Sequence, residues 1–241
     1  MRYKCCHVSE WELSADSSAG FDIVRCMQTV IPDTYAEASA RSDRPIVAAF
    51  DFDVTMTTRD TFLPFLNRAF GRAKVSSAFL RLVPEACKVV VGFSDRDKFK
   101  ELLVSELFSG ECVARLRDEG RRHAAEILEW IRPAARAKAE WHKTQGHRLV
   151  MVSASLDLYL EPVCRELGFD DLLCTRPSVN HLVFDGRLKG YNCRGPEKVR
   201  QLIGLLGDLS KCELHAYGDS AGDREMLSAA DHPNLRVFEP R

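Results

Sequence analysis

The sequence lacks several features that would place it in a specialised class of protein. Its nine cysteines form no CxxC pair and no cysteine/histidine spacing typical of a zinc site. No apolar run approaches the roughly 18 residues of a membrane span, and the N-terminal MRYKCCHVSEWELS has no apolar core of a signal peptide. A formal net charge of −1 gives no reason to expect nucleic acid as a partner. We therefore expect a cytoplasmic protein with reduced thiols.

What the sequence does contain is an alternation of apolar strands and amphipathic helices. Short apolar, β-branched runs are typical of buried strands in a parallel sheet. Strands that alternate with helices indicate an α/β fold with a Rossmann-like, mostly parallel sheet. Pro162 implies that the helix after the second strand starts late or is kinked. The predicted strands are residues 46–50, 148–152, 172–174, 213–217 and 235–238, and a hairpin of 181–184 and 187–189 is predicted around Asp185-Gly186.

A long helical stretch interrupts this alternation after the first strand. Phe99, Leu102, Leu103 and Leu107, for example, recur at the spacing of one helical face. We expect an all-helical cap over residues 58–145, inserted into a Rossmann-like catalytic core of residues 45–57 and 146–241. Residues 1–44 show little periodicity and read as a loosely ordered extension; the alternative is a short strand at 21–24 or a helix packed on the core.

Polar side chains stand where the predicted strands end and where one helix begins. Each has an ordinary explanation on its own, as a turn residue, a helix cap or a solvated lysine. Because the carboxyl ends of parallel strands meet at one edge of the sheet, we expect them to lie together. Four acids, one hydroxyl and one ammonium at that edge would form a metal site that faces an anion site. The residues are Asp51, Asp53, Ser153, Lys198, Asp219 and Asp223.

These residues lie in motifs that resemble a known family. DFDVT, VMVS, GPEKV and GDSAGD look like the four motifs of the haloacid dehalogenase-like superfamily, in the family's order, over roughly residues 45–238. The helical insert is similar to the cap of the phosphoserine phosphatase-like branch. The sequence around the motifs resembles that branch's bacterial hydrolases, which include phosphatidylglycerophosphatase. The resemblance implies a Gly-rich turn after Ser153, whereas Ala154-Ser155-Leu156 follows here, which argues against phosphoserine as the substrate.

The expected chemistry is hydrolysis of a phosphate monoester. We assign Asp51 as the nucleophile, which would form an aspartyl-phosphate intermediate. Asp53 would protonate the leaving oxygen and then take a proton from the attacking water. Ser153 and Lys198 would hold the phosphoryl oxygens. The resemblance also implies that dehalogenases and phosphonatases of this superfamily lack an acid at the position of Asp53.

Mg²⁺ is the cofactor expected for an oxygen-only site with few protein ligands. The resemblance implies that it is held by the Asp51 carboxylate, the Asp53 backbone carbonyl and Asp219, with Asp223 as an additional acid. Val54 departs from the family pattern, in which Gly, Ser or Asn is more usual. Because Ser and Asn are accepted there, we expect residue 54 to have an ordinary negative φ.

The cap sequence says less about the substrate, for which we expect a small phosphorylated metabolite or a phospholipid head group. Thr55, Arg59, Asp60 and Ala154 are candidate substrate contacts, although Asp60 is also placed to cap a helix. A catalytically weak phospho-ligand binding protein on the same fold is the alternative function. A set of basic cap residues indicates either peripheral contact with an anionic membrane or a solvated basic face: Arg68, Arg72, Lys74, Arg81 and Lys88.

Overall fold

The computed structural model describes residues 44–90 and 96–239. The predicted extension, with its alternative strand at 21–24, lies outside these ranges except for Arg44. Arg44 belongs to the folded core, because its guanidinium donates to the carbonyls of Ser210 and Cys212 and pairs with Asp231 at 3.0 Å.

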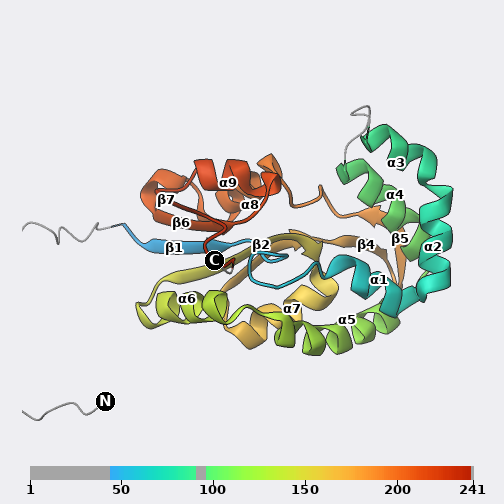
Figure 1. The fold of residues 1–241 in the computed structure, drawn as a ribbon, viewed down its shortest axis with the longest axis horizontal. Coiled ribbons are helices and arrows are strands. Elements are labelled where there is room, and N and C mark those ends of the chain that lie inside the picture. The colour runs from blue at the N-terminus through green and yellow to red at the C-terminus, as the bar shows by residue number, and fades with distance from the viewer. Residues whose placement is uncertain (1–43, 91–95, 240–241) are drawn as a thin grey trace, which may run out of the picture. The chain divides into compact units, whose positions relative to one another are not determined.

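A five-stranded sheet forms the centre of the fold (Figure 1). Each pairing within it is parallel, with β1 between β2 and β6. This confirms the predicted α/β class with a mostly parallel, Rossmann-like sheet. In the order of the sheet, the strands are β3 (Asp171–Thr175), β2 (Arg148–Leu156), β1 (Ile46–Phe50), β6 (Glu213–Gly218) and β7 (His232–Leu235).

Helices cover both faces of this sheet. Successive side chains of β1 point to opposite faces, so Val47 and Ala49 belong to one apolar core while Ala48 and Phe50 belong to the other. Figure 1 shows α8 and α9 on one face and α6 and α7 on the other. These helices are α6 (Pro133–Thr144), α7 (Asp157–Leu167), α8 (Pro196–Leu206) and α9 (Arg224–Ser228).

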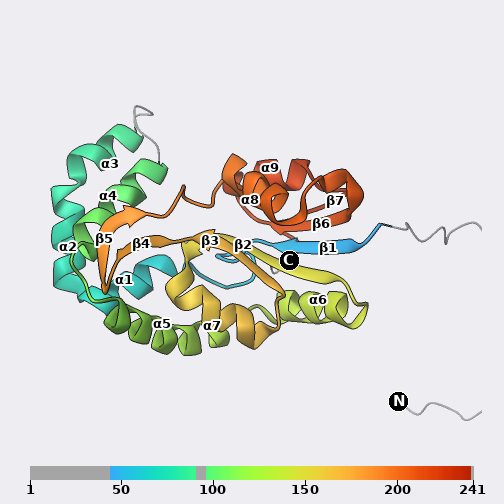
Figure 2. The same ribbon diagram turned by 180° about the vertical axis from the view of Figure 1, so that it is seen from behind.

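Among the described residues between β1 and α6, five α-helices build the cap side of the molecule. A two-stranded antiparallel hairpin, β4 with β5, lies beside α4 (Figure 2). The hairpin therefore packs against the cap helix α4, which precedes it by about 70 residues in the sequence. In contrast, α6 packs on the sheet through Ala135 and Ala139. The elements are α1 (Phe62–Phe70), α2 (Arg72–Arg81), α3 (Val83–Val90), α4 (Arg96–Phe108), α5 (Val113–Ile127), β4 (Pro177–Asn180) and β5 (Val183–Leu188).

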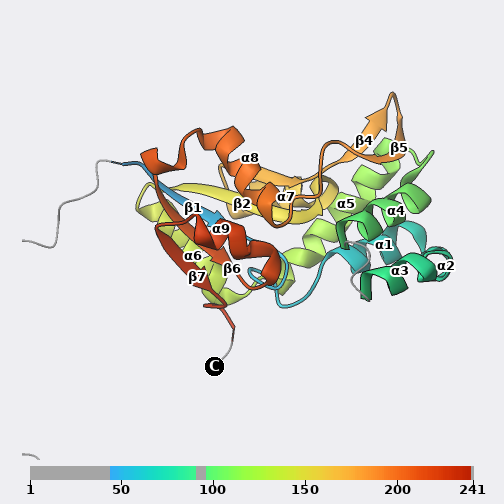
Figure 3. The same ribbon diagram turned by 90° about the horizontal axis from the view of Figure 1, so that it is seen from above.

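The cap and the core meet where α5 packs against α7. A Cβ at Gly120 would lie 2.2 Å from the backbone oxygen of Leu158, so only glycine permits this approach of the two helices. Figure 3 shows α5 running between the cap helices and the sheet. None of the helices within the described ranges is long and apolar enough to span a membrane.

The predicted hairpin turn at Asp185-Gly186 is wrong, because the chain turns at His181-Leu182 instead. His181 takes the positive φ, 56°, that a tight turn requires. Asp185 lies within β5 and its carboxylate accepts a hydrogen bond from Ser178 across the hairpin. Gly186 serves close packing, since a Cβ there would lie 3.1 Å from the backbone oxygen of Ser105 on α4.

Two further strand boundaries differ from the prediction. The second strand does not end at Ser153 but continues to Leu156, with a register shift between these residues, and α7 then begins directly at Asp157 with Pro162 inside it rather than starting late. The last strand is β7 at His232–Leu235, not 235–238. Phe238 lies beyond it and stacks on Phe50 and Tyr217, which explains the apolar run.

Candidate active site

The carboxyl ends of β1, β2 and β6 converge on a cavity of about 200 Å³. Because β1 lies between β2 and β6, residues that follow these three strands become neighbours. The core side of the lining consists of Asp51, Asp53, Ser153, Ala154, Ser155, Arg194, Lys198, Ser220, Gly222 and Asp223, and the cap side of Asp60, Phe62 and Lys100.

Lys198 joins two of the predicted acids. It stands in the first turn of α8, is almost completely buried, and its ammonium lies 2.5 Å from Asp51 and 2.6 Å from Asp223. It also donates to the carbonyl of Val152 at 2.9 Å. Burial disfavours its charged form, but the two carboxylates outweigh this and raise the pKa of Lys198 above its usual value. The lysine is therefore a fixed positive charge beside the predicted nucleophile.

Asp51 is held at the end of β1 by groups on both of its oxygens. Lys198 contacts Oδ1, and the hydroxyl of Thr55 donates to Oδ2 at 2.8 Å. Burial raises the pKa of Asp51 to about 7, against the lowering effect of Lys198. A cation bound beside Asp51 would favour its ionised form further.

A set of oxygens that suits Mg²⁺ lies around Asp51. One carboxylate oxygen each of Asp51, Asp219 and Asp223 lies within 4.8 Å of the others. Thr55 bridges the first two, since its hydroxyl is also 3.2 Å from Asp219 Oδ1. Burial raises the pKa of Asp219 and the neighbouring Asp223 raises it further, against the lowering effect of Thr55 and Lys198. Hard oxygen donors of this kind fit Mg²⁺.

Asp223 has a different task from Asp51 and Asp219. Its Oδ2 accepts from the backbone N–H of Asp219 and from both the N–H and the hydroxyl of Ser220, while Oδ1 faces Lys198. Burial would raise its pKa, but Lys198 and Ser220 together hold it below its usual range. A Cβ at Gly218 would lie 2.6 Å from Asp223 Cβ, so the strand must end in glycine. Asp223 thus positions Lys198 and the loop that carries Asp219.

Asp53 lies on the cap-facing side of the cavity. Its Oδ1 accepts from the N–H and the hydroxyl of Thr61 at 2.8 and 2.6 Å, and its Oδ2 accepts from the Ser155 hydroxyl. Burial raises the pKa of Asp53, and nearby Asp60 raises it further. A raised pKa favours the protonated carboxyl, which is the form that a general acid needs.

Ser153 and Ala154 line the cavity from β2. The Ser153 hydroxyl is buried and accepts a hydrogen bond from the N–H of Ser155 at 3.0 Å. Its own proton therefore points elsewhere, and a phosphoryl oxygen in the cavity is a suitable acceptor. The carbonyl of Ala154 accepts from Lys100.

The structure separates the two candidates at the cap entrance. Arg59 is exposed, lies 4.8 Å over the Trp130 ring and does not line the cavity. Asp60 does line the cavity, and its carboxylate also accepts from the N–H of Leu63 at 3.0 Å at the start of α1. Both interpretations of Asp60, helix cap and cavity wall, are therefore met.

Seven cavity or support residues were not predicted from the sequence. Thr61 and Ser155 hold Asp53, and Ser155 also lines the cavity together with Phe62, Lys100, Arg194, Ser220 and Gly222. Thr61 and Ser155 lie within eight and two positions of predicted site residues, so a search of those stretches for hydroxyl donors would have found them. Lys100 and Arg194 carry no such signal, because a lysine in an amphipathic helix and an arginine before a helix are common.

The expectation of an ordinary φ at Val54 is wrong. Val54 has a φ of 63°, in the left-handed region that a β-branched residue rarely adopts. Its surroundings hold it there: its N–H donates to the Thr57 hydroxyl at 3.0 Å, and Arg132 donates to its carbonyl at 3.3 Å. Such a conformation costs on the order of 1–3 kcal/mol and persists where neighbours fix it.

Comparison with known proteins agrees with this geometry. The model of the haloacid dehalogenase-like hydrolase family matches residues 48–228. The chain belongs to this family. It is 37% identical over 199 residues to Protein CicA of Caulobacter vibrioides, covering 80% of this chain and 87% of that protein. A probable phosphatase of Mycobacterium tuberculosis is 27% identical over 204 residues, covering 78% and 67% of the two chains.

The fold is that of the phosphoserine phosphatase-like branch of the haloacid dehalogenase-like hydrolases. A substrate-bound phosphoserine phosphatase superimposes with a TM-score of 0.54 at 18% identity, covering 78% of this chain and 84% of that one. This likeness concerns the fold, and it agrees with the helical cap that follows β1. The family inferred from the four motifs is confirmed, and the fold agrees with the branch that the helical insert suggested.

Proposed function

We propose that the chain is a Mg²⁺-dependent phosphatase that hydrolyses a phosphate monoester through an aspartyl-phosphate intermediate. The observation that carries this proposal is the surroundings of Asp51, which lies in a small polar cavity beside Lys198 and Thr55. A second acid, Asp53, lies two residues further on with its own set of hydrogen bonds. A nucleophile beside a fixed cation and near a separate acid fits phosphoryl transfer.

Each residue then has a defined task. Asp51 attacks phosphorus while Lys198 and Ser153 contact the phosphoryl oxygens, whose charge is spread in the transition state. Asp53 gives its proton to the leaving alcohol oxygen, and the resulting carboxylate takes a proton from the water that hydrolyses the intermediate. Mg²⁺, when bound by Asp51, Asp219 and the Asp53 carbonyl, would offset the negative charge of the acids and the phosphate.

The cap side of the cavity points to the class of substrate. On this side Lys100 from α4 offers positive charge, Asp60 negative charge and Phe62 an apolar ring, and Arg194 adds a positive charge from the core side. A cavity of about 200 Å³ suits a small phosphorylated group, either a metabolite or the head group of a phospholipid. Thr55 belongs to the metal side, because its hydroxyl is used by Asp51 and Asp219.

The basic cap residues give little support to a membrane-binding surface. Lys74 pairs with Glu111 at 2.8 Å, and Arg68 and Arg81 pair with Glu126 and Glu106. Arg72 is exposed, and the side chain of Lys88 lies outside what the structure describes. Paired charges attract an anionic lipid surface less than free ones, so we favour a solvated face and do not extend the proposal to membrane contact.

Hydrolysis of p-nitrophenyl phosphate with Mg²⁺ tests the proposal. We expect turnover that EDTA abolishes and added Mg²⁺ restores. A panel of phosphorylated metabolites and lipid head groups, assayed by phosphate release, would then identify the substrate. If the folded protein binds inorganic phosphate but releases none from any member of the panel, the alternative of a phospho-ligand binding protein is the correct one.

A further inference from the structure

A second group of metal-binding side chains lies on β6 and β7, away from the cavity. Glu213 and His215 are two residues apart on β6, so their side chains point to the same face of the sheet. His232 is the register partner of His215 on β7, which brings its side chain beside the other two. The parallel pairing of two short strands thus gathers one carboxylate and two imidazoles.

The ligand atoms of these three residues face one another. Glu213 Oε1 lies 2.9 Å from His232 Nε2 and 3.6 Å from His215 Nε2, and one potential ligand atom from each residue lies within 4.8 Å of the others. The two imidazole rings stack with centroids 4.2 Å apart. The 2.9 Å distance between Glu213 and His232 is that of a hydrogen bond. The 3.6 Å distance between Glu213 and His215 is too long for a hydrogen bond, so hydrogen bonding does not explain why His215 faces the carboxylate.

We propose that Glu213, His215 and His232 bind a divalent transition-metal ion of the Zn²⁺ type, with water as the remaining ligand. Imidazole nitrogens with one carboxylate oxygen suit Zn²⁺, whereas Mg²⁺ prefers oxygen donors alone. The surface location, with the His232 side chain half exposed, leaves a path for the ion and for water.

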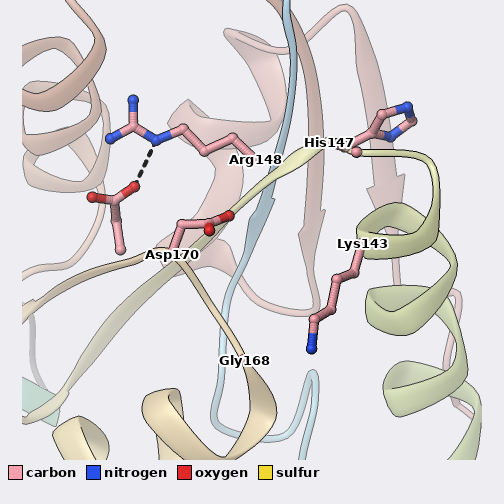
Figure 4. A pocket seen from close by; sticks show the side chains of 7 residues that line it. Lys143, His147, Arg148, Gly168 and Asp170 are labelled. Atoms are coloured by element: carbon pink, nitrogen blue, oxygen red, sulfur yellow. Dashed lines mark hydrogen bonds and ion pairs between the residues drawn. The ribbon is translucent and has the colours of Figure 1, made fainter.

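This site is separate from the active site. Glu213 begins β6, roughly 17 Å along the strand from Gly218, and Asp219 of the active site follows Gly218. It is also separate from the hollow of about 470 Å³ lined by Lys143, Gly168 and Asp170, from which the ring of His147 points away (Figure 4). The charges in that hollow are mixed, and Arg148 there is paired with Asp171 at 2.7 Å.

A metal ion bound at this site would stabilise the attachment of the edge strand β7 to β6. β7 is the outermost strand of the sheet and pairs only with β6 among the described strands. An ion that binds the folded chain more tightly than the unfolded one raises stability with its concentration. We therefore expect Zn²⁺ to raise the melting temperature of the protein without being needed for catalysis.

Imidazole NMR of the full chain tests the proposal directly. Zn²⁺ is titrated in the presence of saturating Mg²⁺ and a reducing agent that does not bind metal, and the ring nitrogen signals of all histidines are followed. We expect the signals of His215 and His232 to shift together, and that of His181, on the distant hairpin turn, to stay unchanged. Zn²⁺ shifts at other histidines only, or at none, would overturn the proposal.

Variants make the test quantitative. His232→Gln and, separately, His215→Gln should weaken Zn²⁺ binding measured by calorimetry at least about tenfold, and both should lose the Zn²⁺-dependent rise in melting temperature. His181→Asn is the matched control, because asparagine accepts the same positive φ. If His215→Gln does not fold, His232→Gln still tests the proposal, because His232 is half exposed; an unchanged Zn²⁺ affinity in His232→Gln would contradict the site. The Mg²⁺-dependent phosphatase turnover of His232→Gln should equal that of the wild type, so the test of the Zn²⁺ site does not depend on the proposed function.

Discussion

The two walls of the active-site cavity hold their lysines in opposite ways. Lys198 on the core wall contacts two carboxylates at 2.5 and 2.6 Å, and its pKa is raised. Lys100 on the cap wall donates to the Ala154 carbonyl and lies 4.6 Å over the Phe62 ring. Burial lowers the pKa of Lys100 to about 8, because Asp53, Asp60 and Asp97 compensate only in part.

This difference separates chemistry from recognition. A lysine locked between two acids keeps its charge at any physiological pH and serves as a fixed electrostatic element. A lysine held by a carbonyl and a ring keeps a large share of its binding capacity for an anionic ligand. The core wall is therefore suited to the phosphoryl group and the cap wall to the remainder of the substrate.

The largest effect should come from the nucleophile of the core wall. Asp51→Asn keeps the shape but removes the attacking charge, so turnover of p-nitrophenyl phosphate should fall at least about 10³-fold. Steady-state kinetics with saturating Mg²⁺ measures this, and an unchanged far-UV spectrum shows that the variant is folded. Near-normal turnover by the folded variant would refute the mechanism.

Asp53→Asn should have the next largest effect, and one that depends on the substrate. If Asp53 protonates the leaving oxygen as proposed, alkyl phosphates should lose about 10²–10⁴-fold in turnover, while aryl phosphates, with better leaving groups, should lose less. Phosphate release from matched alkyl and aryl esters gives the ratio. Equal losses on both would contradict the role of an acid.

Replacing each lysine in turn tests whether Lys198 and Lys100 have different roles. Lys198→Met leaves Asp51 and Asp223 buried without their counter-ion, so the free energy of unfolding should fall by about 3 kcal/mol and turnover should be lost. Lys100→Met should leave the turnover of p-nitrophenyl phosphate largely intact and raise KM for the physiological substrate by roughly tenfold. Equal kinetic effects of both variants would contradict the assignment of Lys198 to catalysis and Lys100 to substrate binding.

The pH dependence of KM sharpens the same point. Since the pKa of Lys100 is lowered to about 8, its ammonium is present below pH 8 and is lost as the pH rises through that value. Affinity for an anionic substrate should fall over this range in the wild type. In Lys100→Arg, whose guanidinium stays charged, the fall should vanish. A persistent fall in the arginine variant would assign the effect to another group.

The sequence correctly indicated which residues lie at or near the carboxyl ends of the strands. Asp51, Ser153 and Asp219 were predicted to meet because parallel strands place their carboxyl ends together, and they line or adjoin one cavity. Lys100 could not be predicted, because it comes from a cap helix whose orientation depends on long-range packing. The Asp185-Gly186 pair gave a wrong hairpin turn for a related reason. Gly186 lies close to α4, and this long-range contact cannot be read from the local sequence.

Val54 is the residue where local reasoning and structure disagree most, and its replacement should have the smallest effect. Val54→Gly removes strain on the order of 1–3 kcal/mol, but glycine gives back about 0.5–1 kcal/mol through the entropy of the unfolded chain. We expect a modest gain in melting temperature. The neighbouring contacts from Thr57 and Arg132 fix the backbone whichever residue stands there.

Turnover should therefore change less than tenfold in Val54→Gly, where tenfold corresponds to about 1.4 kcal/mol of activation free energy. Val54→Ala is the matched control, because alanine keeps a Cβ at positive φ but loses the β-branch. Steady-state kinetics of all three proteins with saturating Mg²⁺ provides the measurement. A gain of a hundredfold or more in the glycine variant alone would mean that Val54 disables the loop between Asp51 and Asp53, and the weak binding protein would then describe the natural chain better than the phosphatase.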